Sequence, residues 1–153
     1  MSKREEFTAA MKEAMKSKDQ VALSTVRLIN AALKDKDIAA RGNGNADGIS
    51  ESEILSMLQS MIKQRQESSK TYRDAGRADL ADREDAEIVI INSFLPAQLS
   101  DAEVGAAIDT VITSIGAADI KDMGKVMNEL KANYAGQMDM AKVGGLVKQK
   151  LSA

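Results

Sequence analysis

The chain has 153 residues, of which 44% are hydrophobic and 29% are charged, so it can bury a core and does not have the composition of a disordered protein. It contains no cysteine and no histidine. This composition excludes disulfides, thiolate nucleophiles, Cys/His zinc sites and catalysis by a histidine acid or base. The net charge of −2 is not that of a protein that binds nucleic acid over its whole surface.

The N-terminus and the hydropathy of the chain predict a cytoplasmic location. The first residues, MSKREE, become amphipathic at once and contain no apolar signal segment. No apolar run approaches the roughly 20 residues that a membrane span needs. The lack of cysteine fits a reducing compartment. We therefore expect no contact with a membrane.

Four helices are predicted in residues 1–95. The first is amphipathic around Phe7 and Met11, and the second is capped by Asp19 and continues to about Ala40. A loop rich in Gly and Asn follows at residues 41–48.

The third helix starts at a capping box formed by Ser50 and Glu53, becomes polar from Lys63 onward and ends at Gly76. The fourth starts near Ala78 with several acidic residues in its first turns, where the helix dipole favours negative charge.

Three shorter helices are predicted after the single proline, Pro96. Ser100 and Glu103 form a second capping box, and the helix that they begin ends at Gly116. Asp119 and Asp122 begin the next helix, and Asp139 caps the last one.

No segment has the alternation of a β-strand, and the aliphatic residues and nine methionines suit helix-on-helix packing. We therefore predict an all-α protein with a four-helix N-terminal domain (residues 1–95), a hinge (96–99) and a small three-helix C-terminal domain (100–153).

Several short strings, in their order and spacing, resemble the GatB/YqeY family. They are MKEAMK (11–16), LSTVR (23–27), MIKQR (61–65), AGRADLA (75–81), LPAQLS (95–100) and MGKVM (123–127), together with Glu84, Glu87 and Ile88. The resemblance covers nearly the whole chain. Family members are similar to the C-terminal region of the B subunit of the tRNA-dependent amidotransferase.

This resemblance implies a C-terminal domain similar to the amidotransferase tail, which is associated with gripping tRNA. The family label is carbon–nitrogen ligase activity with glutamine as amido-N-donor. Residues 136–140 read GQMDM where the family usually carries Gly-Arg-Ala-Asp-Gly, and Asn128 stands where many relatives have Gly. A basic residue and a glycine that could contact nucleic acid are therefore missing at the last turn.

Two serine–lysine pairs are candidates for a nucleophilic site. Ser60 and Lys63 fit the Ser-x-x-Lys spacing of some hydrolases, and Ser69 and Lys70 are the same pair of residue types as in amidases. No accompanying motif or glycine-rich loop supports either pair, and a solvated helix surface explains both. We therefore expect no catalytic site and no cofactor.

The acidic residues between 79 and 87 could bind a hard cation through carboxylate oxygens, or could simply favour a helix N-terminus. We expect the second, and thus no metal site.

Lysines are concentrated near the C-terminus, where residues 121–153 carry six of them and three acids. They could contact phosphates or could be an ordinary solvated surface. Gly124, Gly144 and Gly145 lie inside predicted helices, where glycine is unfavourable, so we expect either close helix packing or, at Gly124, an approaching ligand. The candidate nucleic-acid-binding residues are Lys121, Gly124, Lys125, Lys131, Lys142 and Lys148.

The function that we expect is an accessory role associated with tRNA or with a tRNA-modifying or aminoacylation complex, without DNA as a partner. The alternative is a protein–protein interaction module that binds no RNA and uses the polar third helix and the acidic segment.

Overall fold

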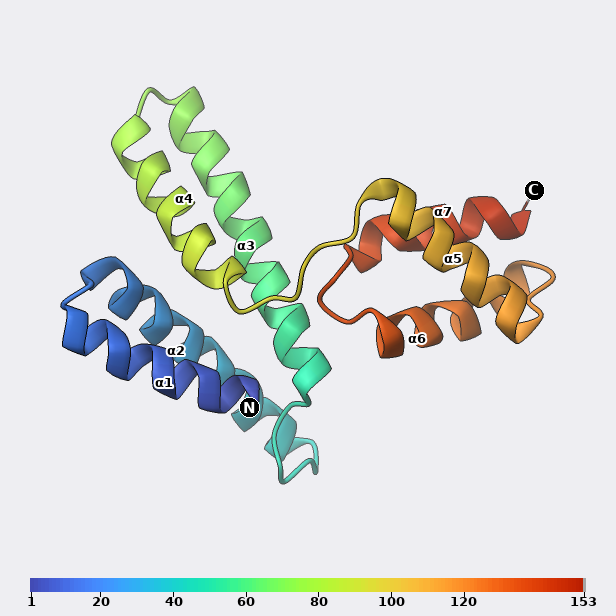
Figure 1. Ribbon diagram of the computed structural model, residues 1–153, viewed down its shortest axis with the longest axis horizontal. Helices are drawn as coiled ribbons and strands as arrows, with labels where there is room; N and C mark the ends of the chain where they lie inside the picture. The colour runs from blue at the N-terminus through green and yellow to red at the C-terminus, as the bar shows by residue number, and fades with distance from the viewer. Residues whose placement is uncertain (153) are drawn as a thin grey trace. The chain divides into compact units, whose positions relative to one another are not determined.

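The computed structural model describes residues 1–152, and its regular secondary structure is entirely helical (Figure 1). Within these residues no strand occurs, so the all-α prediction is confirmed. The chain divides into two compact units, residues 1–95 and the part from Pro96 onward. The helices are α1 (Lys3–Ser17), α2 (Gln20–Gly42), α3 (Glu51–Asp74), α4 (Ala78–Asn92), α5 (Asp101–Ile115), the 3₁₀ turn η1 (Ile120–Asp122), α6 (Met123–Asn133) and α7 (Met140–Ser152).

Three helices begin with the same Ser-x-x-Glu sequence but are capped differently. The hydroxyls of Ser2, Ser50 and Ser100 each accept a hydrogen bond from the backbone N–H three residues later, at 3.2 Å. Glu5 and Glu103 complete the box, because their carboxylates accept from the N–H of the capping serine at 2.8 and 3.0 Å. Glu53 does not return to Ser50, so the capping box predicted there is only half formed.

Two helices end beside the predicted glycines, whereas the start of the sixth helix differs from the prediction. Gly76 and Gly116 have φ angles of 75° and 67°, a left-handed conformation in which a side chain would be strained. The predicted sixth helix instead begins as η1, where the Asp119 carboxylate caps Lys121 N–H at 2.9 Å, and the α-helix starts only at Met123.

The core of the N-terminal unit is apolar and joins all four of its helices. In Figure 1, α1 and α2 form one helical hairpin and α3 and α4 form another. Phe7 of α1 and Phe94 after α4 meet edge to face, with ring centroids 5.0 Å apart. The other buried members are aliphatic or methionine side chains: Val26, Ile29, Leu33, Ile49, Ile54, Met57, Leu58, Met61 and Ile91.

A buried carboxylate joins α1, α2 and the start of α3. The Asp37 Oδ1 atom accepts hydrogen bonds from Arg4 Nη2 at 2.6 Å and from Ile49 N–H at 2.9 Å. Burial raises the pKa of Asp37, but these hydrogen bonds and the Arg4 charge outweigh it and leave the pKa below its ordinary value. Gly48 has a φ of 81°, and a Cβ atom there would lie 2.3 Å from Asp37 Oδ1. The loop therefore requires glycine at this position.

A second ion pair joins α3 to α4. Arg65 Nε lies 2.8 Å from Glu87 Oε2, and the two side chains are only 14% and 11% exposed. Because both charged groups are largely removed from water, each needs the opposite charge of the other to offset its cost of desolvation.

The C-terminal unit has a core without charged groups. Its buried side chains are Val104, Ala107, Ile108, Val111, Val126, Leu130, Met138, Val143, Val147 and Leu151. The segment before α5 is fixed to the α6–α7 turn, because Leu99 N–H donates to Gln137 O at 2.9 Å and the Gln98 amide donates to Gly136 O.

Candidate functional site

The solvent side of α6 carries three lysines that form no ion pair with any residue the structure describes. Lys121, in the turn before the helix, and Lys125 and Lys131 are all exposed, as are Gly124 and Asn128 between them. We call these five residues the α6 surface. Acidic side chains near it are occupied: Glu129 accepts from Asn133, and Asp122 accepts from Ala118 N–H at 2.9 Å.

Asp122 also interacts electrostatically with Lys125. Hydrogen bonds from the backbone of Ala118 and Asp119 lower the pKa of Asp122, and the Lys125 charge lowers it further. Asp122 is therefore ionised at neutral pH and offsets part of the Lys125 charge.

The glycines of α6 and α7 do not all serve helix packing. A Cβ atom at Gly144 would touch the methyl groups of Met123 and Met127 at 3.9 Å, which is ordinary contact. At Gly124 and Gly145 a Cβ atom would meet nothing within 4 Å. The expectation of close packing is therefore wrong at these two positions, and the surface above Gly124 is open.

The remaining predicted lysines differ from those of the α6 surface. Lys142 lies 3.6 Å from Asp101 at the start of α5, whereas Lys148 is exposed and forms no ion pair within residues 1–152. Lys150 pairs with Asp109 of α5 at 2.6 Å. From residue 96 onward the sequence has six lysines and seven acids, so this unit has no overall excess of positive charge and could attract phosphate only locally.

The two serine–lysine pairs do not form a nucleophilic site. Ser69 is buried and donates to Asp85 Oδ1 at 2.7 Å, whereas Lys70 is exposed. Ser60 and Lys63 are both exposed, and no hydrogen bond joins them in the part of the chain that the structure describes. Ser60 has no hydrogen bond to a base among the described residues. The carboxylate that Ser69 contacts, Asp85, is a poor base, because hydrogen bonds from Ser69 and Arg73 lower its pKa.

Arginines pair with most of the acidic residues of α4. Arg73 donates to Asp82 at 3.0 Å and to Asp85 at 2.5 Å. The Ser69 hydroxyl and the Arg73 guanidinium together lower the pKa of Asp85. Asp79 pairs with Arg77, and Glu87 with Arg65. In residues 1–152 no group of three or more acidic side chains is arranged to hold a metal ion.

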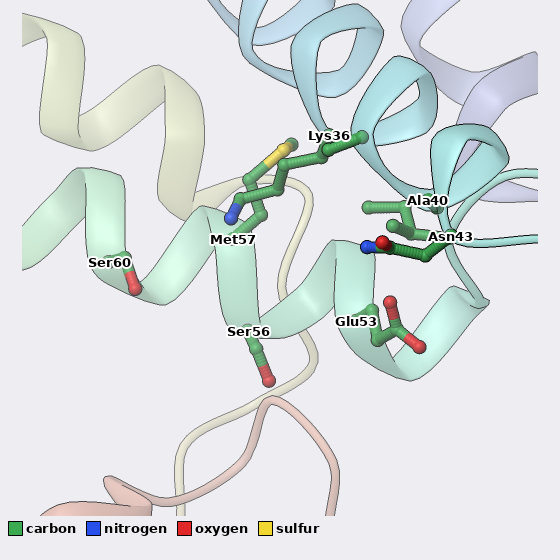
Figure 2. A pocket seen from close by; sticks show the side chains of 9 residues that line it. Lys36, Ala40, Asn43, Glu53, Ser56, Met57 and Ser60 are labelled. Carbon is green, nitrogen blue, oxygen red and sulfur yellow. The ribbon is translucent and has the colours of Figure 1, made fainter.

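A pocket that the sequence reasoning missed lies between the end of α2 and the start of α3 (Figure 2). Its volume is about 390 Å³. We call it the α2–α3 pocket, and its lining residues are Lys36, Ala39, Ala40, Asn43, Ile49, Glu53, Ser56, Met57 and Ser60. The sequence could have indicated this pocket through the spacing of its lining residues. They recur every three or four positions at the end of α2 and again at the start of α3, and they include both polar and apolar side chains.

Comparison with known proteins agrees with the resemblance. The family model described as Yqey-like protein matches residues 4–151. Three curated relatives share the name "Altered inheritance of mitochondria protein 41, mitochondrial". The protein of Lachancea thermotolerans is 32% identical over 108 residues, which are 69% of this chain and 55% of that protein. The protein of Pyrenophora tritici-repentis is 26% identical over 80% of this chain and 68% of its own length. The protein of Vanderwaltozyma polyspora is also 26% identical, over 92% of this chain and 78% of its own length.

The names of these relatives contradict the predicted cytoplasmic location, because each describes a mitochondrial protein. The composition could not have separated the two, since lack of cysteine and of long apolar runs suits any reducing aqueous compartment. Within residues 1–152, no helix has both the length and the apolar character to cross a bilayer. The match to the Lachancea protein spans only about half of that protein's length.

Proposed function

Because the chain belongs to the YqeY-like family, we propose that it is a non-catalytic accessory protein that binds tRNA, alone or within a tRNA-modifying or aminoacylation complex. The contact is made by the α6 surface. The relatives' shared name describes an inheritance phenotype and no reaction, which is consistent with an accessory role.

One observation carries this proposal: three exposed lysines without ion-pair partners among residues 1–152 lie in η1 and α6, together with an open glycine. Lys121 in η1 and Lys125 in the first turn of α6 are four residues apart in sequence and both exposed, so both can contact phosphates of the same strand. Each contact releases counterions from the RNA, which favours binding at low salt. The absence of a Cβ atom at Gly124 allows a phosphate to approach the helix backbone.

The other lysines indicate the side of the C-terminal unit on which RNA binds. Lys142 and Lys150 each lie beside an acid of α5, which offsets part of the positive charge on that side of the C-terminal unit. We therefore expect RNA to contact α6 and not α5.

The test is tRNA binding by the purified protein, measured by fluorescence anisotropy at about 50 mM salt. Changing Lys121, Lys125 and Lys131 together to Gln is expected to weaken binding at least tenfold. The matched control changes Lys12, Lys16 and Lys34 to Gln, which removes the same charge from exposed positions of α1 and α2. The control is expected to bind within about twofold of the wild type, since these lysines lie outside the contact.

Equal losses in both variants, or no binding of tRNA by the wild type, would contradict the proposal. If tRNA does not bind, the protein-interaction module becomes the better explanation.

A further inference from the structure

The α2–α3 pocket brings together two opposite charges that do not pair with each other. Lys36 enters it from α2 and Glu53 from α3, and Figure 2 shows both side chains at its edge. Neither forms an ion pair or a side-chain hydrogen bond within residues 1–152, so their charged atoms are more than 4.0 Å apart. The pocket is therefore lined by one positive and one negative side chain, each without an ion-pair partner among the described residues.

Glu53 faces this pocket although a local partner is available. Glu5 and Glu103 occupy the same position in the same Ser-x-x-Glu sequence, and both close the capping box. Glu53 alone among the three leaves the N–H of its serine and lines the pocket instead. All three serine hydroxyls accept from the N–H three residues later, and Ser50 differs in also sharing a hydrogen bond with the Ser52 hydroxyl at 3.3 Å. In this arrangement the backbone N–H of Ser50 lacks the carboxylate that closes the other two boxes.

The rest of the lining is neutral and of two kinds. Ile49 and Met57 are buried and supply an apolar floor. Asn43, Ser56 and Ser60 supply donors and acceptors, and none of their side chains is hydrogen-bonded to another described residue. Many other helical Ser and Thr hydroxyls of the chain bond to the preceding turn, as Thr8, Thr25 and Thr110 do.

Charge and size select the ligand. A simple anion would be repelled by Glu53 and a simple cation by Lys36, whereas a molecule with both charges satisfies both side chains. In Figure 2 the Lys36 and Glu53 side chains are drawn apart from each other. A small zwitterion with a hydrogen bond of about 2.8 Å at each end can bridge two charged groups that do not touch. The volume of about 390 Å³ accommodates a small ligand and its side chain.

We infer that the α2–α3 pocket binds a free α-amino acid, with its carboxylate on Lys36, its ammonium group on Glu53 and its side chain over Ile49 and Met57. Ser56, Ser60 and Asn43 complete the hydrogen bonds of the two charged groups. This site belongs to the N-terminal unit alone, so its existence does not depend on RNA binding by the C-terminal unit.

Methionine methyl NMR tests this inference, because Met57 lines the pocket and Met61, one turn further along α3, does not. The twenty standard amino acids are titrated individually into the full chain. At least one is expected to shift the Met57 methyl signal saturably, with a Kd below about 5 mM, and to leave Met61 nearly unchanged. The N-acetylated and carboxamide forms of that amino acid are expected to bind at least tenfold more weakly, since each lacks one charge.

Variants complete the test. Lys36→Gln and Glu53→Gln are each expected to weaken binding at least tenfold, whereas the exposed controls Lys34→Gln and Glu67→Gln retain it. Both pocket residues are exposed, so the variants are expected to keep the wild-type helical content. The inference is overturned if no amino acid shifts Met57, if inorganic phosphate binds and amino acids do not, or if binding survives both pocket variants.

Discussion

Charged side chains have different surroundings in the two units. In residues 1–95, Asp37 and Glu87 are buried and held by arginines, and Ser69 and Thr25 are buried with their own hydrogen bonds. In the described part of the C-terminal unit, residues 96–152, no polar or charged side chain is buried, and its ion pairs lie on the surface. The buried ion pairs that support the fold therefore lie in the first unit, whereas the charged side chains of residues 96–152 all remain at the surface.

The physical reason lies in desolvation. A buried charge is stable only with a partner, so removing one member of the pair leaves a large uncompensated cost. An exposed lysine keeps its water and contributes little to folding. The two units should consequently respond very differently to loss of a charge.

The chain supplies a probe for each unit, because its two tyrosines are Tyr72 in α3 and Tyr134 after α6. Urea unfolding of residues 1–95 can be followed by Tyr72 fluorescence in a Tyr134→Phe background. The C-terminal unit can be followed by Tyr134 in a Tyr72→Phe background.

The largest effect is expected at the Arg65–Glu87 pair. Glu87→Ala leaves the Arg65 guanidinium, 14% exposed, without its carboxylate. The free energy of unfolding reported by Tyr72 should fall by about 3 kcal/mol. Glu67→Ala, at an exposed position of α3, should change it by less than about 0.5 kcal/mol. A similar small change for both variants would show that Glu87 is not a structural charge.

Asp37→Asn is expected to cost about 2 kcal/mol at neutral pH, because a neutral amide replaces a carboxylate that two donors share. The pKa of Asp37 is lowered in the folded protein, so its contribution to stability is complete above its unfolded pKa of about 3.9. It is lost as the pH falls through the folded pKa. The difference between wild type and Asp37→Asn should therefore shrink as the pH is lowered from about 5 to about 2. A difference that stays constant over this range would exclude the ionised carboxylate as its source.

Gly124→Ala should stabilise the C-terminal unit by about 0.5–1 kcal/mol, since the helix gains an alanine whose methyl group meets no neighbour. Gly145→Ala, in the equally open position on α7, is the matched control and should give a similar gain. Only Gly124→Ala should weaken tRNA binding, because only this glycine belongs to the α6 surface. Equal tRNA affinity in the two variants would remove Gly124 from the contact.

The smallest effect on stability is expected for the lysines. Changing Lys121, Lys125 and Lys131 together to Gln should alter the unfolding of the C-terminal unit, followed by Tyr134, by less than about 0.5 kcal/mol. A loss of more than about 1 kcal/mol would mean that these lysines stabilise the fold.

Local chemistry made much of the fold predictable. The Asp19 cap, the Ser100–Glu103 box and the glycines at helix ends follow from hydrogen bonds within a few residues of sequence. Features that depend on distant residues were missed. Nothing near Asp37 indicates that Arg4 and Ile49 N–H converge on it. The Ser-x-x-Glu sequence at Ser50 predicts a complete capping box, whereas Glu53 lines a pocket.

The candidate site was predictable in part for the same reason. The sequence places Lys121 and Lys125 near the start of one helix, but it does not show that Lys121 lies in a 3₁₀ turn before that helix. The ion pair between Lys142 of α7 and Asp101 of α5 joins distant residues, so the sequence does not indicate it. The cytoplasmic location was wrong because it relied on properties that different compartments share.

The salt dependence of tRNA binding tests the central claim most directly, since it counts the phosphates that the protein neutralises. If Lys121, Lys125 and Lys131 each contact one phosphate, a plot of log K against log salt for the wild type should be steeper by about 2 to 3 than that for the triple Gln variant. The control variant with Lys12, Lys16 and Lys34 changed should keep the wild-type slope. Identical slopes for the wild type and the triple variant at the α6 surface would contradict the account.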